Sequence, residues 1–178
     1  MALDIYSIFP RYIGKANKHF NLIEHINKLR HLPSGTPEGW VSDKLYSSFD
    51  KDLGNYSEFK PFLDWQDSQV VEYVKKIGID FTGFKCKSWF NIYKKGDYQE
   101  LHAHAPDDIS TIHMVKGSKE SAYTYFKDFQ LDSLPGSQSR EYFSEGQLLI
   151  FPSFLLHGVS QHQLEEERIT IASNYNLL

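Results

Sequence analysis

The sequence predicts a mainly β fold in one domain, with helices first and a jelly roll after them. Three observations support this prediction. The length of 178 residues suits a single domain. Helical periodicity is confined to the first part of the chain, and short β-like runs separated by turn residues fill the rest. We therefore expect a helical and loop-like part over residues 1–83 and a jelly-roll core over residues 84–178.

The first helix is expected between Lys15 and Arg30. Apolar side chains recur there at helical spacing, namely Phe20, Leu22, Ile23, Ile26 and Leu29. Pro33 and Gly35 would end the helix. Residues 33–59 are rich in Ser, Gly, Asp and Pro, which predicts a long loop, and such loops often cover a functional site.

The second helix is expected from a cap at Asp64 or Asp67 to Gly78, which would close it. Its apolar stripe consists of Val70, Tyr73, Val74 and Ile77. Both helices are expected to pack on a sheet.

Six β-like runs follow, at residues 86–93, 109–115, 121–126, 147–151, 155–160 and 168–175. Turn residues separate them, including Gly96, Gly117, Gly136 and Gly146. Many short strands with regular turns indicate an antiparallel sandwich or barrel.

The bulk composition excludes some classes of protein. The formal net charge is −4 and no long basic run is present, so we expect no nucleic-acid partner. No apolar stretch approaches the roughly 20 residues that span a bilayer, and the N-terminus does not resemble a signal peptide. A single cysteine, Cys86, favours a reducing compartment. We expect a soluble, cytoplasmic protein.

Three histidines form a candidate metal site. His102 and His104 are two residues apart, and in an extended chain such residues point to the same side. His157 lies far along the chain in an apolar run. A close pair on one strand and a distant third ligand on another is how a barrel mouth builds a facial site. Imidazole suits Fe(II), Zn and Cu, so these residues alone do not select the metal.

Arg168 and Thr170 form a polar pair that alternates with Ile169 and Ile171. If the polar side faces the barrel interior, the guanidinium needs a polar occupant, because a buried unpaired charge is costly. A dicarboxylate would satisfy it through a two-pronged hydrogen-bonded pair. Alternatively, Arg168 is a surface residue paired with a nearby Glu.

Four segments together resemble the 2-oxoglutarate/Fe(II) oxygenase family, which is related to the prolyl 4-hydroxylases and occurs in bacteria and phages. They are residues 89–98, 102–104, 145–159 and 168–174. The resemblance implies a double-stranded β-helix of the cupin-like, jelly-roll type. It also implies a dioxygenase (hydroxylase) that uses Fe(II), 2-oxoglutarate as co-substrate, and O2.

The resemblance also implies roles for single residues. His102 and His157 match the two family histidines on iron. Arg168 would bind the distal carboxylate of 2-oxoglutarate, and Thr170 would hydrogen-bond it. The remaining pocket candidates are Asn91 and Tyr93, which would line the co-substrate pocket or form a buried polar pair, and Asn174, which shares the inward side of Arg168 and Thr170.

His104 stands where most such oxygenases carry an aspartate. Two His and one carboxylate would leave the Fe(II) site with a net charge near +1, whereas three neutral His leave +2. Bound 2-oxoglutarate is a dianion and would offset that charge. We favour His104 as the third ligand. The alternatives are that Asp107 or Asp108 supplies a carboxylate, or that His104 stays unligated.

Two other functions are consistent with these residues. One is a cupin-type iron dioxygenase that uses three His without 2-oxoglutarate, such as a thiol or diketone dioxygenase. The other is a non-enzymatic jelly-roll binding protein. If the chain is an oxygenase, the partner is a small-molecule or peptide substrate, with prolyl or other amino-acid residues suggested only by the resemblance.

Overall fold

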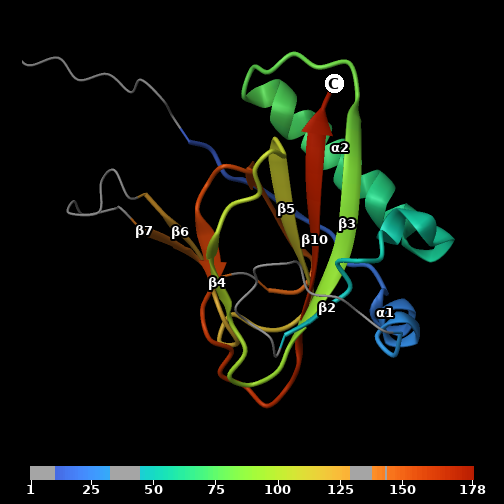
Figure 1. The fold of residues 1–178 in the computed structure, drawn as a ribbon, viewed down its shortest axis with the longest axis vertical. Helices are drawn as coiled ribbons and strands as arrows, with labels where there is room; N and C mark the ends of the chain where they lie inside the picture. The colour runs from blue at the N-terminus through green and yellow to red at the C-terminus, as the bar shows by residue number, and fades with distance from the viewer. Residues whose placement is uncertain (1–10, 33–44, 129–137, 143) are drawn as a thin grey trace, which may run out of the picture.

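The structure is a computed structural model that describes residues 11–32, 45–128, 138–142 and 144–178. Two antiparallel β-sheets face each other, and two helices lie on the outer side of the larger sheet (Figure 1). The predicted mainly β, jelly-roll architecture is confirmed. Neither of the described helices is long and apolar enough to cross a membrane.

Within the described residues the larger sheet has six strands. Their order is β1 (Gly14–Asn17), β8 (Gln147–Pro152), β5 (Ile109–Lys116), β10 (Arg168–Leu177), β3 (Phe84–Tyr93) and β2 (Tyr46–Ser47). The smaller sheet, described over four strands, has the order β4 (Gln99–His102), β9 (His157–Val159), β6 (Thr124–Lys127) and β7 (Gln138–Glu141).

Strand β10 is central in the larger sheet and is covered on both faces. Arg168 and Thr170 point between the two sheets and are fully buried. Ile169 and Ile171, on the opposite side, pack into a cluster with the helices, including Phe62 of the second helix. The alternation expected from the sequence is therefore present, although both of its faces are buried.

The second helix, α2 (Lys60–Lys76), covers the larger sheet with a buried stripe of Phe62, Gln66, Val70, Tyr73 and Val74. The prediction of a cap at Asp64 or Asp67 was wrong. The helix begins four residues before Asp64, with Pro61 in its first turn, where the missing N–H costs no helical hydrogen bond. Asp67 instead accepts a hydrogen bond from the Tyr175 hydroxyl at 2.8 Å.

The first helix was predicted too long. Residues 14–17 form strand β1, paired with Gln147–Ile150 of β8, and α1 covers only Ile23–Leu29. Backbone pairing with β8 competes successfully with the weak helical tendency of this stretch, because tertiary context overrides propensity.

The predicted loop at residues 33–59 is structured where it is described. Residues 33–44 lie outside the described part of the chain. The remainder contains β2 and two 3-10 turns, η1 (Leu53–Asn55) and η2 (Ser57–Phe59), whose Leu53 and Phe59 are buried in the core.

All six predicted strands are present, and each end either matches the prediction or is shifted by at most three residues. Gly96, Gly117 and Gly146 adopt positive φ at the predicted turns, as glycine readily does. The predicted turn at Gly136 lies outside the described residues. Strands β1, β2, β4 and β7 were not predicted as separate runs because they are short and gain their pairing from distant partners.

Candidate metal centre and its pocket

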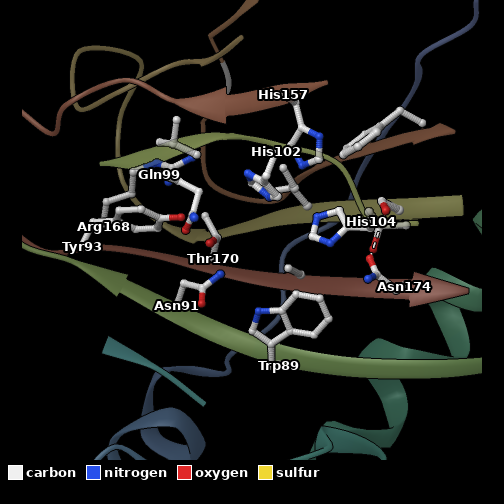
Figure 2. A pocket seen from close by; sticks show the side chains of 16 residues that line it. Trp89, Asn91, Tyr93, Gln99, His102, His104, His157, Arg168, Thr170 and Asn174 are labelled. Atoms are coloured by element: carbon white, nitrogen blue, oxygen red, sulfur yellow. Dashed lines mark hydrogen bonds between the residues drawn. The ribbon is translucent and has the colours of Figure 1, made fainter. Parts of the chain in front are cut away.

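Three imidazoles converge between the two sheets (Figure 2). His102 ends β4 and His157 begins β9, and the two are direct cross-strand partners. His104 follows on the same side as His102. Ring centroids are 4.4 Å apart for His102–His157, 4.8 Å for His102–His104 and 5.1 Å for His104–His157. One nitrogen from each ring lies within 4.8 Å of the other two, so one ion can contact all three.

Hydrogen bonds select which nitrogen faces the centre. His102 Nδ1 lies 2.7 Å from the Glu100 carbonyl oxygen, and His157 Nδ1 lies 2.8 Å from that of Leu155. A carbonyl only accepts, so Nδ1 carries the proton in both rings and Nε2 carries the lone pair. Backbone contacts of this kind orient the histidine ligands of metal sites.

The three rings are neutral at pH 7. Burial lowers the pKa of His102, lowers that of His157 well below its usual value, and, together with His102, lowers that of His104 to about 4. A metal ion needs deprotonated imidazole, so this environment favours coordination.

Neither alternative carboxylate belongs to the cluster. Asp107 accepts hydrogen bonds from the side-chain amides of Asn174 at 2.8 Å and Asn176 at 2.6 Å. Asp108 accepts one from the Leu177 backbone N–H at 2.8 Å. Both carboxylates are thereby held along β10, and His104 is the residue that completes the group.

The opposite end of the pocket contains Arg168, which has no exposed surface. Its guanidinium carbon lies 4.8 Å from the centre of the Tyr93 ring, its cross-strand neighbour. The next pair along the strands is Thr170 and Asn91. All four side chains line the pocket that also contains the three histidines (Figure 2). The alternative of a surface Arg168 is therefore wrong.

Asn174 also lines the pocket, near His104. Its side-chain oxygen accepts from Ser110 Oγ at 3.0 Å while its amide donates to Asp107. These contacts connect β10 to β5 and leave Asn174 as a wall of the pocket.

Trp89 and Gln99 are among the pocket residues that were missed from the sequence. Trp89 has the same parity on β3 as Asn91 and Tyr93, a signal that was available. Gln99 is three residues before His102, and a register irregularity in β4 brings both onto the inner side. In a regular strand, residues three apart point to opposite faces, so alternation alone would have placed Gln99 on the face opposite His102.

The pocket fits a divalent ion at the three imidazoles and an anionic group beside the buried guanidinium of Arg168. Three neutral imidazoles are suitable donors for Fe(II). Three buried polar atoms that line the pocket have no hydrogen-bond partner among the described residues: Trp89 Nε1, Asn91 Oδ1 and Gln99 Oε1. Unpaired polar groups of this kind are costly unless a ligand or water satisfies them.

Residues 87–174, about half of the chain, match the model of a family described as "Putative 2OG-Fe(II) oxygenase". No curated protein matches the sequence.

Solved structures share the fold at low sequence identity. A prolyl-4-hydroxylase of Pseudomonas putida is 12% identical, with a TM-score of 0.64 over 92% of this chain and 91% of that one. The viral collagen prolyl hydroxylase of Paramecium Bursaria Chlorella virus-1 is 15% identical, with a TM-score of 0.61 over 92% and 95%. HygX of Streptomyces hygroscopicus, solved with nickel, 2-oxoglutarate and hygromycin B, is 13% identical, with a TM-score of 0.64 over 92% and 82%. The common fold is the double-stranded β-helix. Because it matches this family model and has this fold, the chain belongs to the 2OG-Fe(II) oxygenase family, and its structure is like that of the prolyl 4-hydroxylases.

Proposed function

We propose that this protein is a 2-oxoglutarate- and Fe(II)-dependent dioxygenase that hydroxylates a small molecule or an amino-acid residue of a peptide. One observation carries the proposal. Three neutral imidazoles meet at one end of a pocket whose other end contains the buried guanidinium of Arg168.

In this proposal His102, His104 and His157 hold the iron. Arg168 makes a two-pronged pair with the distal carboxylate of 2-oxoglutarate, and the Thr170 hydroxyl donates to the same carboxylate. Asn91 and Tyr93 form the wall beside it. Support for a bound dicarboxylate comes from HygX, a protein of the same fold that was solved with nickel and 2-oxoglutarate.

Bound Fe(II) with 2-oxoglutarate and O2 supplies the oxidising chemistry. The chain contributes position and environment. The backbone carbonyls of Glu100 and Leu155 keep Nε2 of two histidines turned inward. Arg168 offsets the charge of the dicarboxylate inside the barrel, and the buried walls keep bulk water from the reacting groups.

The test is succinate formation from 2-oxoglutarate with Fe(II), compared among the wild type, His157→Ala and Arg168→Ala. We expect His157→Ala to abolish iron binding and turnover. Arg168→Ala should mainly raise the KM for 2-oxoglutarate. His31→Ala, at an exposed histidine of the described chain, is the matched control and should leave turnover unchanged. Equal turnover in all variants would reject the proposal.

The all-histidine donor set favours one second candidate, a three-His cupin-type dioxygenase that does not use 2-oxoglutarate. Oxygen consumption distinguishes the two functions. Uptake that requires 2-oxoglutarate and is sensitive to Arg168→Ala supports the first, whereas uptake without 2-oxoglutarate supports the second.

A further inference from the structure

The pocket continues outward along the inner faces of β3 and β10. Their antiparallel register forms a ladder of side-chain pairs: Tyr93–Arg168, Asn91–Thr170, Trp89–Ala172, Lys87–Asn174 and Lys85–Asn176. Alternate residues of a strand lie on one face, so all ten side chains share the inner face. The Trp89 ring lies beside His104, with centroids 6.2 Å apart. The last two pairs therefore lie beyond the metal centre, away from Arg168.

A second cavity occupies this outer end, and we call it the mouth cavity. Its lining comprises Phe49, Lys85, Cys86, Lys87, Trp89, Asp107, Asn174 and Asn176. Trp89 and Asn174 also line the inner pocket, so these two residues form the common wall of the two cavities. A ligand in the mouth cavity would have to pass Trp89 to reach the three histidines.

Trp89 has an unused hydrogen-bond donor at this wall. Its side chain is 1% exposed, and Nε1 has no hydrogen-bond partner among the described residues. Burying an amide-like N–H without a partner is unfavourable, so an acceptor on a bound ligand would stabilise this arrangement.

The mouth cavity is cationic. Lys85 and Lys87 are exposed, and neither forms a salt bridge with any residue in the described part of the chain. The Lys87 ammonium lies 3.7 Å from the Phe49 ring centre, which holds it over the cavity. Asp107 supplies the opposing charge, but its carboxylate oxygens accept from Asn174 and Asn176. The two positive charges of Lys85 and Lys87 therefore exceed the one negative charge of Asp107.

We propose that the mouth cavity binds an anionic group of the substrate, a carboxylate or phosphate, through Lys85 and Lys87. This inference rests on the proposed function, which puts the reaction at the three histidines. Strand residues two apart are separated by about 7 Å, so the two lysines stand about 7 and 13 Å beyond Trp89. The substrate is then an elongated acid, with its anionic group on the order of 10 Å from the carbon that reacts.

Two matched pairs of probes test this inference on the full chain with Mn(II) and 2-oxoglutarate present. The small-molecule pair is hexanoate and hexanamide. The peptide pair is acetyl-Ala-Ala-Glu-amide and acetyl-Ala-Ala-Gln-amide. Members of each pair differ in one negative charge, and the two pairs distinguish a small acid from an acidic peptide. Saturation-transfer NMR gives the dissociation constants, and line broadening by Mn(II) reports which end of the probe lies near the metal.

We expect the acid of at least one pair to bind about three- to tenfold more tightly than its neutral partner, as two exposed ion pairs allow. The double variant Lys85→Gln/Lys87→Gln should abolish this preference. Lys28→Gln/Lys75→Gln removes the same charge from two exposed helix positions and should retain it. Mn(II) should broaden the end of the probe that is remote from the anion.

Equal affinity for acid and amide in both pairs would overturn the inference, as would a preference that the Lys85→Gln/Lys87→Gln protein retains. Failure of the proposed function would give a different set of results. In that case the wild-type protein would bind neither Mn(II) nor 2-oxoglutarate, while the lysine-dependent preference for the acid would persist.

Discussion

At the scale of single residues, the three histidines are held in different ways. His102 and His157 each have Nδ1 bonded to a backbone carbonyl. No described residue hydrogen-bonds the His104 ring, which is positioned by packing against Trp89 and the other two rings. In the proposed metal site, His104 is therefore the residue whose orientation would depend most on the ion itself.

This difference predicts the behaviour of His104 variants. His104→Ala should weaken Co(II) binding by roughly 100-fold or more, because it removes a direct ligand where even loss of an outer contact costs 10- to 100-fold. His104→Asp should retain binding, since a carboxylate at this position faces the same centre. Titration of Co(II) by visible absorption measures both affinities. An unchanged affinity in His104→Ala would mean that this ring does not contact the ion.

His113 on β5 gives a separate prediction about acid stability. Its ring is buried against Phe62, Trp65 and Phe20, with centroids 4.8, 5.8 and 6.3 Å away. Burial, with a smaller effect of His19, lowers its pKa from 6.5 to about 4. Between these values the unfolded chain binds the proton and the folded protein does not. The free energy of unfolding should therefore fall by about 3 kcal/mol as pH drops from 6.5 to 4.

Urea unfolding at pH 7, 5.5 and 4.5 checks this for the wild type and His113→Phe. His113→Phe should lose markedly less stability over this pH range, because a phenyl ring cannot take up a proton. His31→Phe, at an exposed position, should keep the wild-type slope. Parallel slopes for wild type and His113→Phe would contradict the prediction.

At the scale of elements, the candidate metal centre depends on how closely β9 approaches β4. Gly158 follows His157, and a Cβ added there would lie 2.9 Å from the Gln99 backbone oxygen and 2.6 Å from the Tyr125 hydroxyl. The tyrosine can move, but the backbone oxygen belongs to the paired strand. A side chain at residue 158 would therefore push apart the strands that carry His157 and His102.

Gly158→Ala should lower the free energy of unfolding by about 1–3 kcal/mol, as overpacking does, and should weaken Co(II) binding at the same time. Chemical denaturation and Co(II) titration measure the two effects. Gly83→Ala is the matched control, because a Cβ there meets nothing within 4 Å, and it should leave both quantities near the wild-type values. Full metal affinity in Gly158→Ala would show that the strands tolerate the added methyl group.

At the scale of the whole molecule, the sequence predicts the features that depend on alternating residues along a strand and on turn-forming residues such as glycine. The shared side of His102 and His104, the inward face of Arg168 and Thr170, and the turns at glycine all follow from local rules. Features that depend on a distant partner do not follow. Strand β1 exists through its pairing with β8, and Gln99 turns inward through an irregularity in β4. Lys85 and Lys87 reach the mouth cavity only through the register of β3 with β10.

The two ends of the pocket belong to different sheets, which has a consequence for stability. The histidines come from β4, from the residues just after it and from β9, on the side of the smaller sheet, whereas Arg168 and Thr170 come from β10 of the larger one. A metal ion with 2-oxoglutarate would contact both sheets. A ligand that binds only the folded state at 100 times its dissociation constant stabilises it by about 2.7 kcal/mol.

For a chain of this length that energy corresponds to a rise in Tm of about 5–10 °C. We expect Co(II) and 2-oxoglutarate together to raise the Tm by more than the sum of their separate effects, because the ion supplies part of the binding site for the dicarboxylate. Differential scanning fluorimetry of three proteins checks this. His157→Ala should lose both shifts, while Arg168→Ala should keep the Co(II) shift and lose most of the increment from 2-oxoglutarate. Strictly additive shifts in the wild type would mean that the ion and the dicarboxylate bind apart from each other, and that the two sheets are not joined through one shared site.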